Sequence, residues 1–239
     1  MATLAIIPAR GGSKRVPDKN VRPFLGTPLL AWTIRFARHF GRFDNIVVST
    51  DSLSIAQVAE AEGISVPWLR PAVLASDTAG AVDMALHALQ QEKLSGRKYD
   101  SVALLQPTSP VRLLQRWHEA FDHMVEKNFS AAVGFVPAAS HPFHTFEIGK
   151  SGNARPFIEG GTAQTKLRTQ DLPPAYTIAG NLYLVTTAVL ENKKTFFPED
   201  TIGIVCDDPC EAFDIDTVAD WIAAEAIAKH YEQKPWPRS

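Results

Sequence analysis

Short apolar runs alternate with longer stretches of helical periodicity along most of the chain. The apolar runs predict strands at residues 3–7, 46–50, 65–69, 101–105, 131–136, 182–185 and 202–205. Apolar residues at helical spacing predict helices at residues 28–38, 51–62, 79–93, 113–127 and from about residue 217 onward. This alternation is typical of β-α-β units, so we expect an α/β fold built on a mostly parallel sheet.

The alternation breaks between residues 137 and 175, where Pro, Gly, His and Thr are frequent. Such a segment is too long for a plain connection in a compact domain, so we predict a projecting arm at 137–175. The core would then consist of residues 1–136 and 176–239. The last helix is expected to pack through an apolar side that carries Val218, Trp221, Ile222 and Ile227.

Composition narrows the class of protein. Of the 239 residues, 45% are hydrophobic and 21% are charged, which is ordinary for a globular protein. The net charge of -2 provides no general basic field, so an anionic ligand must be met by local cations and nucleic acid is not an expected partner. Without an apolar run of about 18 residues or a signal-peptide core, we expect a cytoplasmic protein that binds no membrane. Cys206 and Cys210 are then expected to be reduced thiols.

A basic, glycine-containing segment follows the first predicted strand. It reads Pro-Ala-Arg-Gly-Gly-Ser-Lys-Arg-Val-Pro-Asp-Lys-Asn at residues 8–20. Glycines let backbone N–H groups turn toward an anion, Ser13 adds a hydroxyl donor, and four cations offset phosphate charge: Arg10, Lys14, Arg15 and Lys19. The alternative is a solvated basic turn. Neither the Walker A pattern nor the dinucleotide fingerprint is present, which disfavours a kinase or a dehydrogenase.

Two aspartates stand directly before the last predicted helix, at Asp214 and Asp216. In an extended segment, alternation points both carboxylates to the same side, where they could hold Mg²⁺ together with substrate phosphates. The alternative is that Asp216 or Thr217 merely caps the helix. Combined with a phosphate-binding loop, the pair favours a metal site, because polyphosphate chemistry requires charge compensation.

A third polar segment, Gln-Pro-Thr-Ser-Pro at 106–110, follows another predicted strand. Together these segments resemble the CMP-sialic acid synthetase (acylneuraminate cytidylyltransferase) family, which includes bacterial enzymes that activate legionaminic and pseudaminic acids. The resemblance is carried by I-I-P-A-R-G-G-S-K-R-V-P-D-K-N at 6–20, R-P-A-V-L-A-S-D-T-A at 70–79, L-Q-P-T-S-P at 105–110 and F-D-I-D-T at 213–217.

The resemblance implies a Rossmann-like nucleotidyltransferase that acts as a homodimer through the arm. The enzyme would transfer CMP from CTP to a nine-carbon acidic sugar and release pyrophosphate. The CTP phosphates would be bound by Arg10, Gly11, Ser13, Lys14 and Lys19, with Arg10 and Lys19 also catalytic. The cytidine pocket would contain Asn20, Arg70 and Ala79. The sugar would face Gln106, Thr108, Ser109, Tyr183, Phe196 and Phe197. Asp214 and Asp216 would position Mg²⁺, and one of them would help to deprotonate the attacking hydroxyl.

The chain departs from the family pattern in the sugar half. Ile-Ala-Gly-Asn at 178–181 stands where Asn-Gly-Ala is common, and Thr169 stands where an arginine often meets the sugar carboxylate. We expect Arg168, or Lys166 from the other subunit, to take that role, although Arg168 could be a solvated arm residue. The identity of the nonulosonic acid therefore stays open. The alternative functions are another sugar nucleotidyltransferase, of the KDO or sugar-1-phosphate type, and a non-catalytic nucleotide-binding module.

Overall fold

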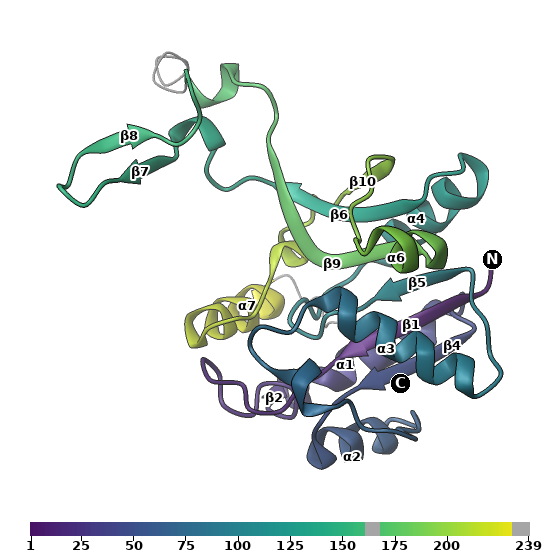
Figure 1. Cartoon of the computed structure of the whole chain (residues 1–239). Coiled ribbons are helices and arrows are strands. Elements are labelled where there is room, and N and C mark those ends of the chain that lie inside the picture. Colours follow the sequence, from purple (N-terminus) through teal and green to yellow (C-terminus); the bar gives the residue numbers. More distant parts are fainter. Residues whose placement is uncertain (161–167, 231–239) are drawn as a thin grey trace.

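A six-stranded sheet forms the centre of the computed structural model, which describes residues 1–160 and 168–230 (Figure 1). In chain order its strands are β1 (Thr3–Pro8), β4 (Asn45–Ser49), β5 (Ser101–Leu104), β6 (Ala131–Pro137), β9 (Tyr176–Thr186) and β10 (Thr201–Val205). They lie in the spatial order β10-β6-β9-β5-β1-β4. Neighbouring strands are parallel except around β9, which is antiparallel to both β5 and β6. The predicted α/β class is confirmed.

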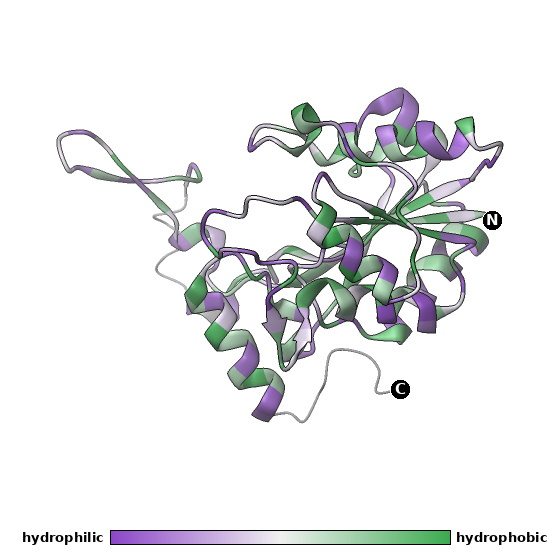
Figure 2. Ribbon diagram, turned by 90° about the horizontal axis from the view of Figure 1, so that it is seen from below, coloured by the Kyte–Doolittle hydropathy of each residue, from purple (hydrophilic) through white to green (hydrophobic). Residues whose placement is uncertain are grey.

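Helices cover both faces of the sheet, because successive side chains of the buried strands point to opposite sides. Ala5 and Ile7 of β1 pack with α1 (Leu29–Phe40), α2 (Leu53–Ala61) and α4 (Leu114–Glu126). Leu4 and Ile6 pack with α3 (Ala81–Leu94) and α6 (Thr187–Lys193) on the other face. Figure 2 shows the sheet between these helical layers. Such burial on both faces explains why β1 reads as a continuous apolar run.

The last helix, α7 (Val218–His230), packs differently from our expectation. Trp221 is buried with Ala224 and Ala228, whereas Val218 is 45% and Ile222 is 64% exposed. The buried face meets the short β2 (Pro23–Phe24) and β3 (Thr27–Pro28) hairpin, where the Trp221 ring lies edge-on to Phe24. The predicted apolar side is therefore wrong for Val218 and Ile222. The true packing face contains two alanines and is only weakly hydrophobic, so the sequence pattern did not indicate it.

The strand predicted at residues 65–69 is also wrong. Ile64 and Val66 turn toward the body and Ser65 and Pro67 outward, so the alternation that suggested a strand is present. The segment nevertheless joins no sheet in the structure. Pro67 has no N–H to contribute to a ladder, which disfavours strand pairing here.

The segment between β6 and β9 leaves the body and ends in a hairpin of β7 (Phe146–Ile148) and β8 (Ala154–Pro156) (Figure 1). β9 begins at Tyr176, earlier than the strand predicted at 182–185, because its first residues pair with the end of β6. Short 3₁₀ turns occur at Ala72–Ala75, Pro142–His144, Thr169–Asp171 and Pro209–Ala212. Within the described residues, none of the helices is long and apolar enough to cross a membrane.

Candidate active site

A cavity of about 400 Å³ lies at the carboxyl ends of β1 and β5. In open α/β sheets ligands bind at this edge, because the loops that follow neighbouring strands meet there. The predicted site residues that line the cavity are Arg10, Ser13, Lys14, Lys19, Asn20, Arg70, Ala79, Gln106, Thr108, Asp214 and Asp216. Segments far apart in the sequence therefore contribute to one cavity.

The loop after β1 is held in shape by hydrogen bonds between its backbone and the side chains of Asp51 and Asn20. The Gly11 N–H donates to Asp51 Oδ1 at 2.9 Å, and a Cβ at Gly11 would lie 3.2 Å from the Ser52 Cβ. Gly12 has a φ of 65°, in the left-handed region that favours glycine. The Asn20 side chain closes the loop by donating to the Arg10 carbonyl at 3.0 Å. Gly11 is thus a structural member of the loop and does not line the cavity.

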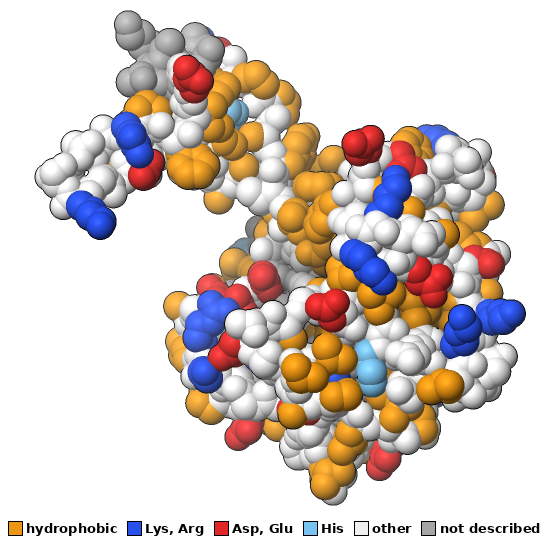
Figure 3. Space-filling model, viewed as in Figure 1, with side chains coloured by type: hydrophobic (Ala, Val, Ile, Leu, Met, Phe, Trp, Pro, Cys, Tyr) orange, Lys and Arg blue, Asp and Glu red, His pale blue; other side chains and the backbone are white. Residues whose placement is uncertain are grey.

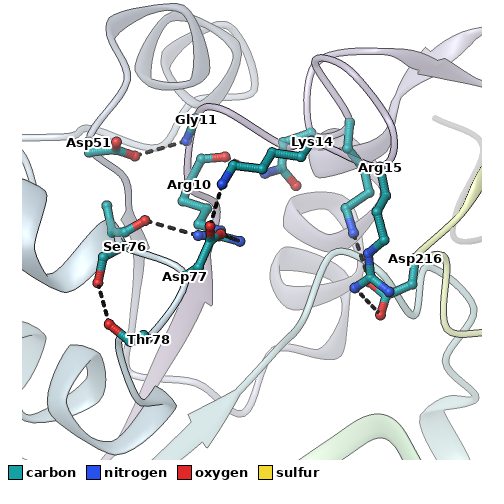
Figure 4. Close-up of polar contacts among 12 residues, drawn as sticks. Arg10, Gly11, Lys14, Arg15, Asp51, Ser76, Asp77, Thr78 and Asp216 are labelled. Atoms are coloured by element: carbon teal, nitrogen blue, oxygen red, sulfur yellow. Dashed lines mark hydrogen bonds and ion pairs between the residues drawn. The ribbon is translucent and has the colours of Figure 1, made fainter.

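The cations of this loop are divided between two carboxylates (Figure 4). Asp77 accepts from Arg10 Nη2 at 2.8 Å and from Lys14 Nζ at 2.7 Å. Hydrogen bonds from Lys14 and Arg10 hold the pKa of the Asp77 carboxyl below its usual value. Our sequence analysis quoted the motif that contains Asp77 but gave this residue no role. It was detectable as the one carboxylate in an otherwise uncharged stretch between Pro71 and Gly80.

Asp216 forms the second ion-pair centre. It accepts from Arg15 Nη2 at 2.8 Å and from Lys19 Nζ at 3.1 Å, and Lys19 also donates to the Ile215 carbonyl. Helix capping does not account for Asp216. The Thr217 hydroxyl accepts from the Asp220 N–H, and the Asp220 carboxylate accepts from the Thr217 N–H, a reciprocal capping box. The Asp216 carboxylate is thus left to face the loop cations.

Arg70 is a buried cation with unused donors. Its side chain is 6% exposed, and its Nε and Nη2 atoms have no hydrogen-bond partner among the described residues. Burial lowers the pKa of Arg70, an effect partly offset by Asp51. Buried donors without a partner are uncommon in proteins and commonly mark a missing ligand or water. Since Arg70 lines the cavity, a ligand with acceptor atoms would satisfy it.

The residues predicted to face the sugar fall into two groups. Gln106 and Thr108 line the cavity, and the Thr108 carbonyl accepts from the Ile215 N–H at 2.8 Å, which ties this segment to the aspartates. Ser109 is buried, does not line the cavity, and its hydroxyl has no partner within the described part of the chain.

The second group is an aromatic cluster. The Tyr183 ring lies edge-on to Phe196 and Phe197, with ring centroids 6.0 and 5.9 Å apart. Burial, with a smaller effect of Asp214, raises the pKa of Tyr183. None of the three side chains lines the cavity, but Tyr183 lies near enough to Asp214 to respond to its charge.

Arg168 lies on the arm and does not line this cavity. Its side chain is 75% exposed and its Nε donates to Asp171 Oδ2 at 2.9 Å. Lys166 lies outside the described residues. Within one chain, Arg168 therefore does not join Gln106 and Thr108 at the cavity.

The aspartate pair suits a magnesium ion that is shared with a nucleotide. Among residues 1–160 and 168–230, no cluster of three or more His, Cys, Asp or Glu side chains is arranged to hold a metal. Three aspartates among these residues offer carboxylate oxygens at the cavity, and of these Asp214 and Asp216 lie on one segment whereas Asp77 pairs with Arg10 and Lys14. Mg²⁺ commonly takes one or two protein carboxylates and fills its remaining positions with phosphate oxygens and water, so the donor set fits.

Comparisons with known proteins agree with this chemistry. A family model described as Cytidylyltransferase matches residues 4–214. The chain is 37% identical over 228 residues to the CMP-N,N'-diacetyllegionaminic acid synthase of Legionella pneumophila, covering 95% of this chain and 96% of that protein. It is 34% identical over 238 residues to a pseudaminic acid cytidylyltransferase of Campylobacter jejuni, covering 96% and 97% of the two chains. The chain therefore belongs to the cytidylyltransferase family, which confirms the predicted family and its enzymatic class.

Two further likenesses are more distant. The chain is 33% identical over 205 residues to the N-acylneuraminate cytidylyltransferase of Streptococcus agalactiae, covering 84% of this chain but 47% of that protein. A solved structure of a CMP:2-keto-3-deoxy-manno-octonic acid synthetase complexed with CTP superimposes with a TM-score of 0.70 at 16% identity, covering 97% of this chain and all of that one. At that identity the superposition supports the fold alone.

Proposed function

We propose that this protein transfers CMP from CTP to a nonulosonic acid and releases pyrophosphate. The observation that carries the proposal is the composition of the cavity. Phosphate-loop cations, three aspartates, a buried arginine with donors that lack a partner among the described residues, and the side chains of Gln106 and Thr108 surround one space. The names of the similar proteins from Legionella pneumophila and Campylobacter jejuni support the same class of substrate.

In the proposed reaction a hydroxyl oxygen of the sugar attacks the α-phosphorus of CTP. The oxygen–phosphorus bond to the sugar forms, the bond to the pyrophosphate oxygen breaks, and the hydroxyl proton passes to a carboxylate of Asp214 or Asp216. Arg10 and Lys19 would stabilise the negative charge on the phosphoryl oxygens and the departing pyrophosphate. Mg²⁺, when held by the two aspartates, would supply further charge compensation and help to orient the phosphates.

The ion pairs of Asp77 support a route by which the triphosphate would bind. Arg10 and Lys14 both face the exposed carboxylate of Asp77, and phosphate oxygens would replace that carboxylate as their partner. The loop would therefore keep the arrangement of its cations before and after CTP binds. We assign Ser13 to the same phosphates and Asn20, Arg70 and Ala79 to the cytidine, because all four line the cavity next to the loop.

We further propose that two copies of the chain associate through the arm. Phe146, Ile148 and Phe157 are 43%, 65% and 72% exposed on it, and an isolated hairpin with such an apolar surface is typical of a protein contact. Figure 3 shows the arm standing away from the body. We also propose a cytoplasmic enzyme, since CTP is its co-substrate and both cysteines are buried free thiols.

The direct test is to incubate the purified protein with CTP, Mg²⁺ and separate nonulosonic acids, and to measure pyrophosphate. We expect release that depends on all three components and stops when a chelator is added. Binding of CTP without pyrophosphate release would instead support a non-catalytic module. Release only with KDO or a sugar 1-phosphate would assign the protein to another class of nucleotidyltransferase.

A further inference from the structure

An irregular stretch of β9 lies against the segment that carries Gln106. β6 and β9 pair regularly at Val133 with Tyr183, and pairing resumes only at Phe135 with Ile178. Residues 179–182 thus lie opposite Gly134 alone and form a bulge, a feature that often re-aims side chains next to active sites. This bulge contains the Ala-Gly-Asn step at which the sequence departs from the family pattern.

The bulge and the Gln106 segment are in close contact. Gly180 has a φ of 77°, and a Cβ built on it would lie 2.8 Å from Ser109 Oγ and 3.5 Å from Gln106 Oε1. A side chain at this position would be strained by the backbone conformation and would displace the Ser109 hydroxyl. The position of the Gln106 side chain in the cavity is therefore linked to the position of the bulge.

Arg112, a buried arginine, connects the bulge to the Gln106 segment through hydrogen bonds. Arg112 is fully buried, its Nε donates to the Asn181 carbonyl at 3.0 Å, and its Nη2 donates to the Gln106 carbonyl. The third contact is from Nη1 to the Thr33 hydroxyl at 3.2 Å, and the guanidinium carbon lies 5.7 Å from the Phe36 ring centroid. A planar guanidinium with several fixed donors suits a bridge between two backbone carbonyls better than an ammonium does.

The other side of the bulge is fixed as well. Asn181 Oδ1 lies 2.5 Å from the position of a Cβ on Gly134, so the amide crosses the strand where only glycine leaves room. The same amide is 3.5 Å from Glu211 Oε1, and Glu211 is buried next to Arg116. With Asn181 held at its side chain and its carbonyl, the bulge has one defined position relative to Gln106.

We propose that Arg112 is a positioning residue for the acidic sugar, which sets the distance between Gln106 and the 179–182 bulge without touching the substrate. This inference rests on the proposed function, since it assigns the sugar to the Gln106 end of the cavity. The nucleotide end is built from other segments, the loop after β1 and the residues around Arg70. Loss of the bridge should therefore affect the sugar and leave CTP binding nearly unchanged.

The test uses Arg112→Lys, which keeps a positive charge but replaces the fork of donors by a single ammonium group. We expect KM for the sugar to rise about tenfold or more and KM for CTP to change less than about twofold. Gly180→Ala should show the same split, because its Cβ would press on Ser109 and Gln106. This second variant keeps the test informative if Arg112→Lys folds poorly.

The matched control is Arg97→Lys. Arg97 also donates through its guanidinium fork, at 2.6 and 3.0 Å to the buried Glu92, but Glu92 does not line the cavity, whereas Gln106, the partner of Arg112, does. The Arg97→Lys variant should lower the melting temperature and leave the ratio of the KM values for the sugar and for CTP unchanged. Equal increases of both KM values in Arg112→Lys and Gly180→Ala would overturn the positioning role while leaving the proposed function intact. A wild-type protein that releases no pyrophosphate with any nonulosonic acid would overturn both.

Discussion

Asp77 and Asp216 are chemically equal carboxylates that each bind two loop cations, yet we assign them opposite effects on the reaction. We propose that Asp77 would compete with the phosphates for its partners Arg10 and Lys14, whereas Asp216, which pairs with Lys19, would remain at the cavity with CTP bound. The difference follows from position. Asp77 belongs to the exposed segment after the 3₁₀ turn Ala72–Ala75, and Asp216 to the segment before α7, which the Ile215 N–H ties to the Thr108 carbonyl.

For Asp216→Asn we predict a loss of turnover on the order of 10² or more, the scale typical of removing a group that stabilises charge in the transition state. The fold should be retained, because Thr217 and Asp220 cap α7 without it. Pyrophosphate release at saturating substrates measures the effect. Near-normal turnover that also resists a chelator would contradict the assignment of Asp216 to the metal.

For Asp77→Asn we predict a lower KM for CTP, by about threefold to tenfold, with little change in kcat. The amide cannot form the ion pairs that CTP would displace, and the expected change is about threefold to tenfold and no larger because exposed ion pairs are weak. Initial rates at varied CTP concentration provide the measurement. An increase in KM for CTP would show that Asp77 supports the bound nucleotide instead of competing with it.

The two cysteines give a prediction that does not depend on the reaction. Burial raises the pKa of Cys206 to about 12 and that of Cys210 to about 11, so both thiols stay protonated at pH 8. Since the thiolate is the reactive form, a thiol reagent should label neither cysteine in the native protein and both after denaturation. Rapid labelling of the native protein would show that the segment around 206–210 opens readily.

At the scale of elements, the arm is the segment that packs least against the rest of its own chain. It has a two-stranded hairpin and exposed apolar side chains, whereas the body has helices on both faces of its sheet. Because Pro137 pairs with Tyr176, an Asn-Gly turn can connect β6 directly to β9.

We predict that replacing residues 138–175 by this turn leaves the body folded and yields monomers in light scattering. The native protein should be dimeric at micromolar concentration. A shortened protein that stays dimeric, or a native protein that is monomeric, would mean that the subunit contact lies elsewhere.

Arg168 should act across that contact, since within its own chain it pairs with Asp171 and does not line the cavity that Gln106 lines. We predict that Arg168→Ala raises KM for the sugar far more than KM for CTP. Mixed dimers of Arg168→Ala and Asp216→Asn chains should recover activity, because one of their two sites has both residues intact. Equal changes in both KM values, or no recovery on mixing, would indicate a solvated or structural arginine.

At the scale of the whole molecule, local patterns were sufficient for most elements and for the cations of the loop after β1, whereas Asn20, Arg70 and Ala79 were expected at the cavity only from the family resemblance. β1 and α1 could be predicted because their apolar residues follow the periods of a strand and a helix, and the loop after β1 because phosphate binding requires glycines and cations. The wrong strand prediction around Pro67 shows the limit of such patterns. Alternation of apolar and polar residues does not reveal whether a neighbouring strand is available for pairing.

Contacts between distant segments could not be predicted in the same way. The antiparallel insertion of β9 between β5 and β6, and the bridge from Arg112 to Gln106 and Asn181, depend on sequence separations that carry no local signal. The ion pairs of Asp77 are a further example, since nothing in its own segment points to Arg10.

The departures from the family pattern all lie in the part of the molecule to which we assign the sugar. The Ala-Gly-Asn bulge and the Thr169 position lie outside the segments that would meet CTP, so we expect nucleotide use to follow the family and sugar choice to differ from N-acetylneuraminate. The same separation underlies the expected split between the KM values of the two substrates in the variants above.

The most direct measurement of the central claim is a competition in which limiting CTP and Mg²⁺ meet equal concentrations of N-acetylneuraminate, legionaminic acid and pseudaminic acid. Mass spectrometry of the products should show a CMP–sugar conjugate formed in equal amount with pyrophosphate. We predict a higher kcat/KM for legionaminic or pseudaminic acid. A preference of about tenfold or more for N-acetylneuraminate, about 1.4 kcal/mol in transition-state binding, would contradict the role of the altered bulge. The absence of any CMP–sugar product would contradict cytidylyl transfer itself.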